Sequence, residues 1–272
     1  MTLDQNPERK PGASNDAQAQ APLVPISAED FGRGKRRIVL VCVGAALLAV
    51  LAAVWIFRRS VDPMDAQRAF EEGQRLLKAT RYTEAILSFD RAVALKSDLA
   101  DAYLLRGRAN MALTHLDPAV QDFTTVIRLR PADARAFVDR ATAQLGQENY
   151  RAVIADCGEA LMRDSRLAPA YNLRGIALRQ TGSAQQALQD LNRAVELDPD
   201  DPANYFQRAT TYQQIGDHKM AMADLDQVLT LLPGSPMGYL ARAKSRAALG
   251  DLAGARKDRE AGRVLEDRDP GR

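Results

Sequence analysis

The chain has 272 residues, a formal net charge of +2 and 6% aromatic residues. A nucleic-acid-binding protein usually carries a basic excess or a concentrated basic stripe, so the balance of 37 basic and 35 acidic side chains argues against that class. The two cysteines, Cys42 and Cys157, fall in different predicted units and provide no disulfide framework.

The amino-terminal segment, residues 1–37, is rich in Ala, Pro, Gln, Asn and Asp and shows no helical or strand periodicity before its basic end. Such a composition cannot bury enough apolar surface to offset the entropy of ordering the chain. We therefore expect a disordered tail that ends in a basic flank, formed by Arg33, Lys35, Arg36 and Arg37.

Residues 38–57 then read IVLVCVGAALLAVLAAVWIF, a run without any charged side chain. A helix of this length spans about 30 Å, which matches the hydrocarbon thickness of a bilayer. The run is longer than the apolar stretch of a signal peptide and has no small-residue cleavage site after it. It predicts a single uncleaved transmembrane helix.

The basic residues around this segment predict its orientation. The flank of 33–37 holds four cations, whereas only Arg58 and Arg59 follow the apolar run. A first helix commonly keeps its more positive side in the cytoplasm, so we expect a single-pass protein of the inner membrane whose remaining chain lies on the periplasmic or outer face. The inverted, cytoplasm-facing topology is the alternative.

A short linker, residues 58–65, leads to a 34-residue pattern that fills residues 66–269 without insertion, and residues 270–272 form a tail. Positions 8 and 20 of the pattern hold only small residues, while position 24 is larger in most copies, as in Phe89, Phe123 and Leu191. The six copies are 66–99, 100–133, 134–167, 168–201, 202–235 and 236–269.

These spacings predict two helices in each copy. Positions 4, 8 and 11 form one stripe of a first helix, and positions 20, 24, 27 and 28 form the facing stripe of a second. Glycine at position 15 supplies the turn between them, and proline at position 32 ends the second helix. The glycines are Gly182, Gly216 and Gly250, and the prolines are Pro131, Pro199 and Pro233.

Column by column, this pattern resembles the tetratricopeptide repeat (TPR) family, over about three quarters of the chain. The resemblance implies an all-α, right-handed superhelical solenoid of six helix-turn-helix repeats, here preceded by the predicted transmembrane helix. In the TPR family, such a solenoid usually binds another protein or a peptide in a concave groove lined by positions 2, 5, 9 and 12 of the first helices.

Positions 5 and 12 are apolar in the first three repeats and mixed in the last three. A groove of this kind suits the apolar face of an amphipathic helix, with flanking arginines that favour acidic residues in the partner. The alternative is that the same side chains pack between neighbouring repeats. The predicted partner-binding residues are Phe70, Leu77, Leu104, Arg108, Met111, Arg135, Val138 and Leu145.

A TPR subgroup that grips acidic carboxyl termini of chaperones uses Lys, Asn, Asn, Lys and Arg at set positions. This chain instead offers Phe70, Gln74, Leu105, Arg135 and Asp139. The sequence therefore predicts that this carboxylate clamp is absent.

Two charged columns recur in five copies, with arginine at position 7 and aspartate at position 23. Because the paired helices run antiparallel, these positions come near each other or near the adjoining repeat. They form either a structural Arg–Asp ladder or a set of arginines that binds anionic ligands. The near one-to-one match favours the ladder. The columns are Arg106, Arg140, Arg174, Arg208 and Arg242, and Asp122, Asp156, Asp190, Asp224 and Asp258.

No catalytic or metal-binding constellation emerges from the sequence. His115 and His218 are expected to be exposed turn residues, and Cys157 a small buried hydrophobe. We therefore expect a non-enzymatic, membrane-tethered scaffold for a protein or peptide partner, with no cofactor, no metal and no small-molecule substrate. The alternatives are the cytoplasm-facing adaptor and an accessory subunit of an enzyme complex.

Overall fold

The computed structural model describes Val50 and residues 63–268, and the predicted transmembrane segment 38–57 lies outside the described residues apart from Val50. The chain divides into two units, Met1–Ser60 and Val61–Arg272. Helices α2 to α13 all belong to the second unit. Within the described part of the chain, no helix combines the length and hydrophobicity needed to cross a membrane.

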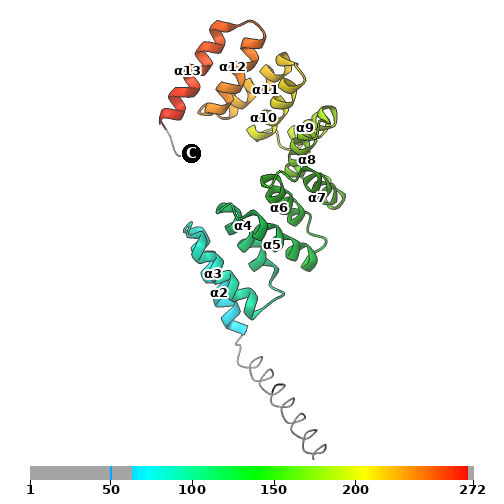
Figure 1. Ribbon diagram of the computed structural model, residues 1–272, viewed down its shortest axis with the longest axis vertical. Helices are drawn as coiled ribbons and strands as arrows, with labels where there is room; N and C mark the ends of the chain where they lie inside the picture. The colour runs from blue at the N-terminus through cyan, green and yellow to red at the C-terminus, as the bar shows by residue number, and fades with distance from the viewer. Residues whose placement is uncertain (1–49, 51–62, 269–272) are drawn as a thin grey trace, which may run out of the picture. The chain divides into compact units, whose positions relative to one another are not determined.

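The second unit is built from antiparallel helix pairs, and each pair packs on the next (Figure 1). The first helices of the pairs are α2 (Pro63–Lys78), α4 (Ala100–Ala112), α6 (Ala134–Gly146), α8 (Ala168–Gln180), α10 (Pro202–Gln214) and α12 (Pro236–Ala248). The second helices are α3 (Tyr82–Leu95), α5 (Leu116–Leu129), α7 (Tyr150–Arg163), α9 (Ala184–Leu197), α11 (His218–Leu231) and α13 (Leu252–Arg268). Helices α4, α6, α8, α10 and α12 begin 34 residues apart, as the repeat predicts.

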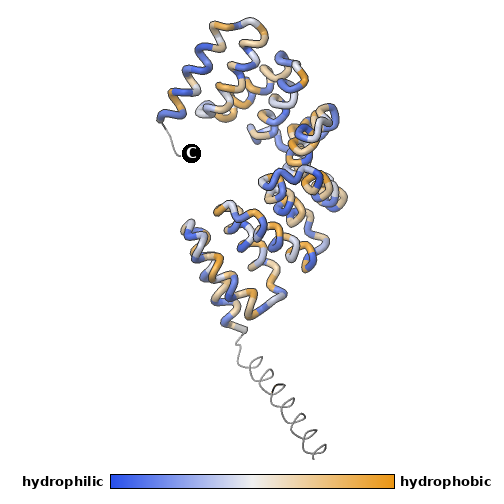
Figure 2. Tube along the Cα trace, in the orientation of Figure 1, coloured by the Kyte–Doolittle hydropathy of each residue, from blue (hydrophilic) through white to orange (hydrophobic). Residues whose placement is uncertain are grey.

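The apolar side chains are distributed along the whole array rather than gathered in one centre. Hydrophobic and hydrophilic residues alternate along each helix (Figure 2). Phe89, Phe123, Leu191 and Leu225, all at position 24, are completely or almost completely buried. Stability in such an array is the sum of contributions within each hairpin and between neighbours.

Two buried columns were not predicted. Position 3 and position 10 of the first helices are small and fully or almost fully buried, as in Ala102 and Ala109 of α4 or Ala136 and Ala143 of α6. These positions lie two turns apart on one side of the helix, and α4 and α6 pack against the second helix of the preceding pair. In α2 the same two positions are Arg68 and Arg75, and both are exposed.

The turn inside each pair needs one residue in the left-handed region, at position 15. Gly182, Gly216 and Gly250 have φ between 83° and 88°, as predicted. The other three pairs make the same turn with a residue that has a side chain, at φ 58°. These residues are Thr80, Thr114 and Glu148.

Helices α5, α9 and α11 end two residues before the predicted prolines at position 32. Helices α3 and α7 end at the same repeat position as α5, α9 and α11, although position 32 is Ser97 and Ser165 in those two copies. Proline at position 32 is therefore compatible with this end but is not required for it. Helix α13, with no described helix after it, continues to Arg268.

Candidate binding face

The first helices form one side of the array because they contact each other directly from one pair to the next. Such contacts join α2 to α4, α6 to α8, α8 to α10 and α10 to α12. We call the residues at positions 2, 5, 9 and 12 of these helices the first-helix face. All eight predicted partner-binding residues belong to it.

The six apolar members of the predicted site are half-buried and contact the core. Phe70 packs on Phe89, with ring centroids 6.0 Å apart and the rings tilted. Leu77 packs in the same cluster as Leu105 of the next repeat. Leu104 and Met111 pack around Phe123, and Val138 and Leu145 pack around Cys157. These side chains therefore hold the helices together and present only part of their surface to solvent.

The two predicted arginines are exposed and differ in their partners. Arg108 donates from Nη2 to Oδ2 of Asp139, at 3.0 Å, and so joins α4 to α6. Burial raises the pKa of Asp139, and Arg108 opposes this effect. The side chain of Arg135 forms no ion pair with any residue between 63 and 268.

In the second half of the array, positions 5 and 12 carry hydrogen bonds between repeats. Asn172 Nδ2 donates to Asn204 Oδ1 at 2.8 Å, which joins α8 to α10. Gln213 Nε2 donates to the carbonyl of Ala241 and to Oγ of Ser245, both at 2.7 Å. The sequence showed that these columns become polar, but not that the polar groups pair across the repeat boundary.

Arg179, at position 12 of α8, occupies a place that is apolar in the first three repeats. Its Nη2 donates to Oε1 of Gln207 at 3.0 Å. Its Nε is buried and has no hydrogen-bond partner in the described part of the protein. Burial lowers the pKa of the Arg179 guanidinium. Arg179 is thus a half-buried cation that has no carboxylate partner among the described residues.

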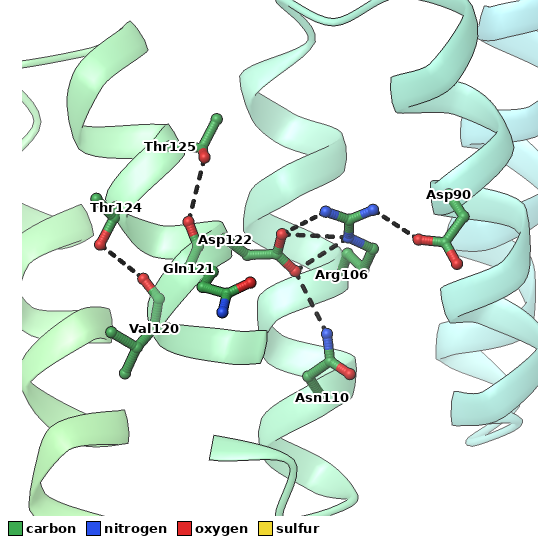
Figure 3. A network of polar contacts seen from close by, with 8 residues as sticks. All are labelled: Asp90, Arg106, Asn110, Val120, Gln121, Asp122, Thr124 and Thr125. Atoms are coloured by element: carbon green, nitrogen blue, oxygen red, sulfur yellow. Dashed lines mark hydrogen bonds and ion pairs between the residues drawn. The ribbon is translucent and has the colours of Figure 1, made fainter. Parts of the chain in front are cut away.

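The position-7 arginines behave differently, as Arg106 shows (Figure 3). Its Nε and Nη2 donate to both carboxylate oxygens of Asp122, at 2.5 to 3.2 Å. Its Nη1 donates to Asp90 of the preceding repeat at 2.6 Å. Asn110 Nδ2 adds a bond to Asp122 at 3.3 Å. The Arg106 guanidinium therefore joins the two helices of its own hairpin, α4 and α5, and also bonds to α3 of the preceding hairpin.

The Arg–Asp pair within the hairpin recurs in every repeat from the second to the sixth, and it confirms the structural Arg–Asp ladder. The position-23 carboxylates are only 3 to 8% exposed, so this is a buried network and not a row of weak surface pairs. Each arginine also lies over the aromatic ring at position 4 of its helix, as Arg106 lies 5.2 Å from the centroid of Tyr103. The other pairs are Arg140–Asp156, Arg174–Asp190, Arg208–Asp224 and Arg242–Asp258.

The remaining reactive side chains do not form a chemical site in the described residues. Cys157 is completely buried, which raises the pKa of its thiol to about 12. His115 is exposed as expected, whereas His218 is half-buried with its Nδ1 unbonded, so the prediction of an exposed turn residue was wrong for His218. Residues 63–268 contain no cluster of three potential metal ligands.

These features define an all-α solenoid of helical repeats whose charges are largely paired inside the array. Models of the tetratricopeptide repeat match residues 70–134 and 202–233, and a model described as TPR repeat matches residues 175–216. The resemblance noted in the sequence is thus found independently in both halves of the array.

Part of the chain is similar to a curated protein. The DnaJ homolog subfamily C member 7 of Homo sapiens is 30% identical over 92 residues, which are 34% of this chain and 18% of that protein. The match therefore spans less than a fifth of that relative.

Two solved structures are similar in fold alone, because their sequence identity is low. PilW, a widely conserved type IV pilus biogenesis factor, is 19% identical with a TM-score of 0.66, over 76% of this chain and 94% of PilW. YrrB, a TPR protein with an unusual peptide-binding site, is 18% identical with a TM-score of 0.51, over 66% of this chain and 92% of YrrB.

Proposed function

We propose that this chain is a membrane-tethered TPR scaffold that binds a protein or peptide along its first-helix face, in the assembly of a complex at the cell envelope. The observation that carries the proposal is the contrast between its charged groups. The ladder arginines are neutralised by buried aspartates, whereas Arg135 and Arg179 on the first-helix face form no ion pair in the described residues.

The apolar part of the face supports the same proposal. Phe70, Leu104, Met111 and Val138 keep part of their surface exposed while their inner atoms pack on the core. A partner helix would cover this remaining surface, and methionine adapts its shape to different ligands. PilW and YrrB, which share the fold, are a pilus biogenesis factor and a protein with a peptide-binding site.

Site-specific photocrosslinking in intact cells tests the binding role. A photoreactive residue replaces Arg108 or Arg135, both of which are exposed on the first-helix face. The matched control replaces Arg91, which is exposed on the second helix α3. We expect the first two positions to capture one and the same protein and the control to capture none. Equal capture from all three positions would place the partner elsewhere.

The tether is proposed from the apolar run at 38–57 and its basic flanks. Protease added to cells with a permeabilised outer barrier should digest the repeats and spare the amino-terminal tail. Digestion of the tail alone would mean the inverted, cytoplasm-facing adaptor. Release of the full-length chain by alkaline carbonate would contradict the tether itself.

A further inference from the structure

Arg179 is the only position-12 residue of the six repeats that carries a charge. In the first and third repeats, Leu77 and Leu145 occupy this position and pack in clusters with Leu105 and Leu173 of the following repeat. In the fourth repeat the corresponding pair is Arg179 and Gln207. An apolar contact between repeats has thus been replaced by a polar one.

This replacement leaves the guanidinium incompletely bonded. The ladder arginines use the edge formed by Nε and Nη2 to hold both oxygens of an aspartate, as Arg208 does with Asp224 at 2.9 and 2.7 Å. On Arg179 the same edge meets a single amide oxygen at Nη2, and Nε has no partner. A buried donor without an acceptor costs free energy, so packing alone does not account for Arg179.

The charges around Arg179 favour an anionic ligand. On the first-helix face of the last three repeats, Arg179 and Lys244 are the charged residues, and no acidic residue is present at positions 2, 5, 9 or 12 of α8, α10 and α12. Gln207 is half-buried, so its side chain is the group that a ligand would displace.

We propose that Arg179 anchors a glutamate or aspartate side chain of a partner segment that lies along α8, α10 and α12. The partner carboxylate replaces the amide oxygen of Gln207 and accepts hydrogen bonds from both Nε and Nη2, in the geometry of the ladder pairs. This site rests on the proposed function, because it requires a partner on the first-helix face, and it specifies the chemistry of that partner.

The test uses the full-length chain and two synthetic probe peptides. Both peptides are acetylated and amidated, and they differ only in carrying three glutamates or three glutamines among alanine and leucine residues. Affinity is measured by fluorescence anisotropy, and the Nε–H resonance of Arg179 is followed by NMR. We expect the glutamate peptide to bind about tenfold more tightly or better, since one bidentate charge-assisted pair contributes at least that factor.

Three variants connect this preference to Arg179. Arg179→Leu restores the apolar residue of the third repeat, and Gln207→Glu supplies an internal carboxylate to the same edge; both should stay folded and lose the preference. Gln207→Ala removes the amide from the Nε–Nη2 edge of Arg179 and should keep the preference for the glutamate peptide. Thermal unfolding of each variant verifies the fold.

Arg135→Gln removes an exposed cation from the same face and is the matched control. Equal affinity for the two peptides, or binding of neither, would overturn the inference. Loss of the preference in Arg135→Gln as well would also overturn it, because the attraction would then come from diffuse charge. In each of these cases the proposed function is still tested separately, by the crosslinks from positions 108 and 135.

Discussion

A β-carbon added to Gly107 would lie 2.7 Å from Cε1 of Phe123, so the ring of α5 occupies the space that a side chain on α4 would need. The same relationship joins Gly73 to Phe89 at 2.5 Å and Gly175 to the Cγ of Leu191 at 2.7 Å. Positions 8 and 24 therefore share one volume in these three hairpins, and a larger residue at one position requires a smaller residue at the other.

Gly107→Ala should destabilise the protein although alanine favours helix. The clash with the fully packed Phe123 ring costs about 1–3 kcal/mol, which exceeds the gain of about 0.5–1 kcal/mol in helix propensity. Urea unfolding measures the difference. Because Ala209 faces Leu225 in the fifth repeat, Phe123→Leu should recover part of the loss in the double variant. A double variant less stable than either single variant would contradict this shared volume.

Much of the hairpin was predictable from these columns, because a 34-residue period with small residues at positions 8 and 20 leaves few ways to pair the helices. The inter-repeat contacts of positions 3 and 10 were not. Small residues at positions 3 and 10, such as Ala102 and Ala109, are buried by the preceding hairpin, and a stripe analysis within a single hairpin does not reveal them. Thr80 and Thr114 adopt the left-handed turn because the two packed helices impose it, against their own preference.

The binding face was predictable only in part. The sequence identified the apolar columns at positions 5 and 12. These side chains are half-buried, so each one packs on the core and also faces solvent. Sequence spacing does not tell which part of a side chain is buried and which part is exposed. In the sequence, Arg179 is one polar residue in the mixed column at position 12. Its importance depends on an unbonded Nε, and this depends on where Gln207 of the next repeat lies.

One repeat of the ladder lacks the bond to the preceding repeat, at Gly158 in α7. In the other repeats the Nη1 atom of the position-7 arginine binds a side chain 16 residues earlier: Asp90, Thr124, Asn192 or Asp226. The corresponding residue for Arg174 is Gly158, and a β-carbon there would meet no atom within 4 Å. The repeat boundary therefore has room for the absent group.

Gly158→Asp should stabilise the array. Replacing a mid-helix glycine contributes a few tenths of a kcal/mol or more, and the new ion pair with Arg174 adds about 0.2–1 kcal/mol. Gly158→Asn is the matched control, since Asn192 occupies this position in the next repeat and carries no charge. Thermal unfolding at low and high salt separates the contribution of the ion pair from that of removing glycine. The extra stability of the aspartate variant over the asparagine variant should become smaller as the salt concentration rises. An advantage that persists unchanged at 1 M salt would rule out the ion pair.

Cys157 should make stability fall at alkaline pH. Burial raises its pKa to about 12 in the folded protein, whereas an unfolded thiol titrates near about 8.5. The folded state therefore holds the proton more tightly than the unfolded state. The resulting stabilisation of the folded state is complete below the unfolded pKa, and it is lost as the pH rises from there toward the folded pKa. The free energy of unfolding, measured in urea from pH 8 to 10, should fall more steeply in the parent protein than in Cys157→Ala. Parallel slopes would contradict this assignment.

The ladder also has a direction. Asp90 comes before Arg106 in the chain, Asn192 before Arg208, and Asp226 before Arg242, so the guanidinium that ties two hairpins always belongs to the later one. The hairpins that precede Arg106, Arg208 and Arg242 therefore each offer an acceptor to the first helix of their successor. An array that ended after the fifth hairpin would leave Asp226 without Arg242, which is its partner here.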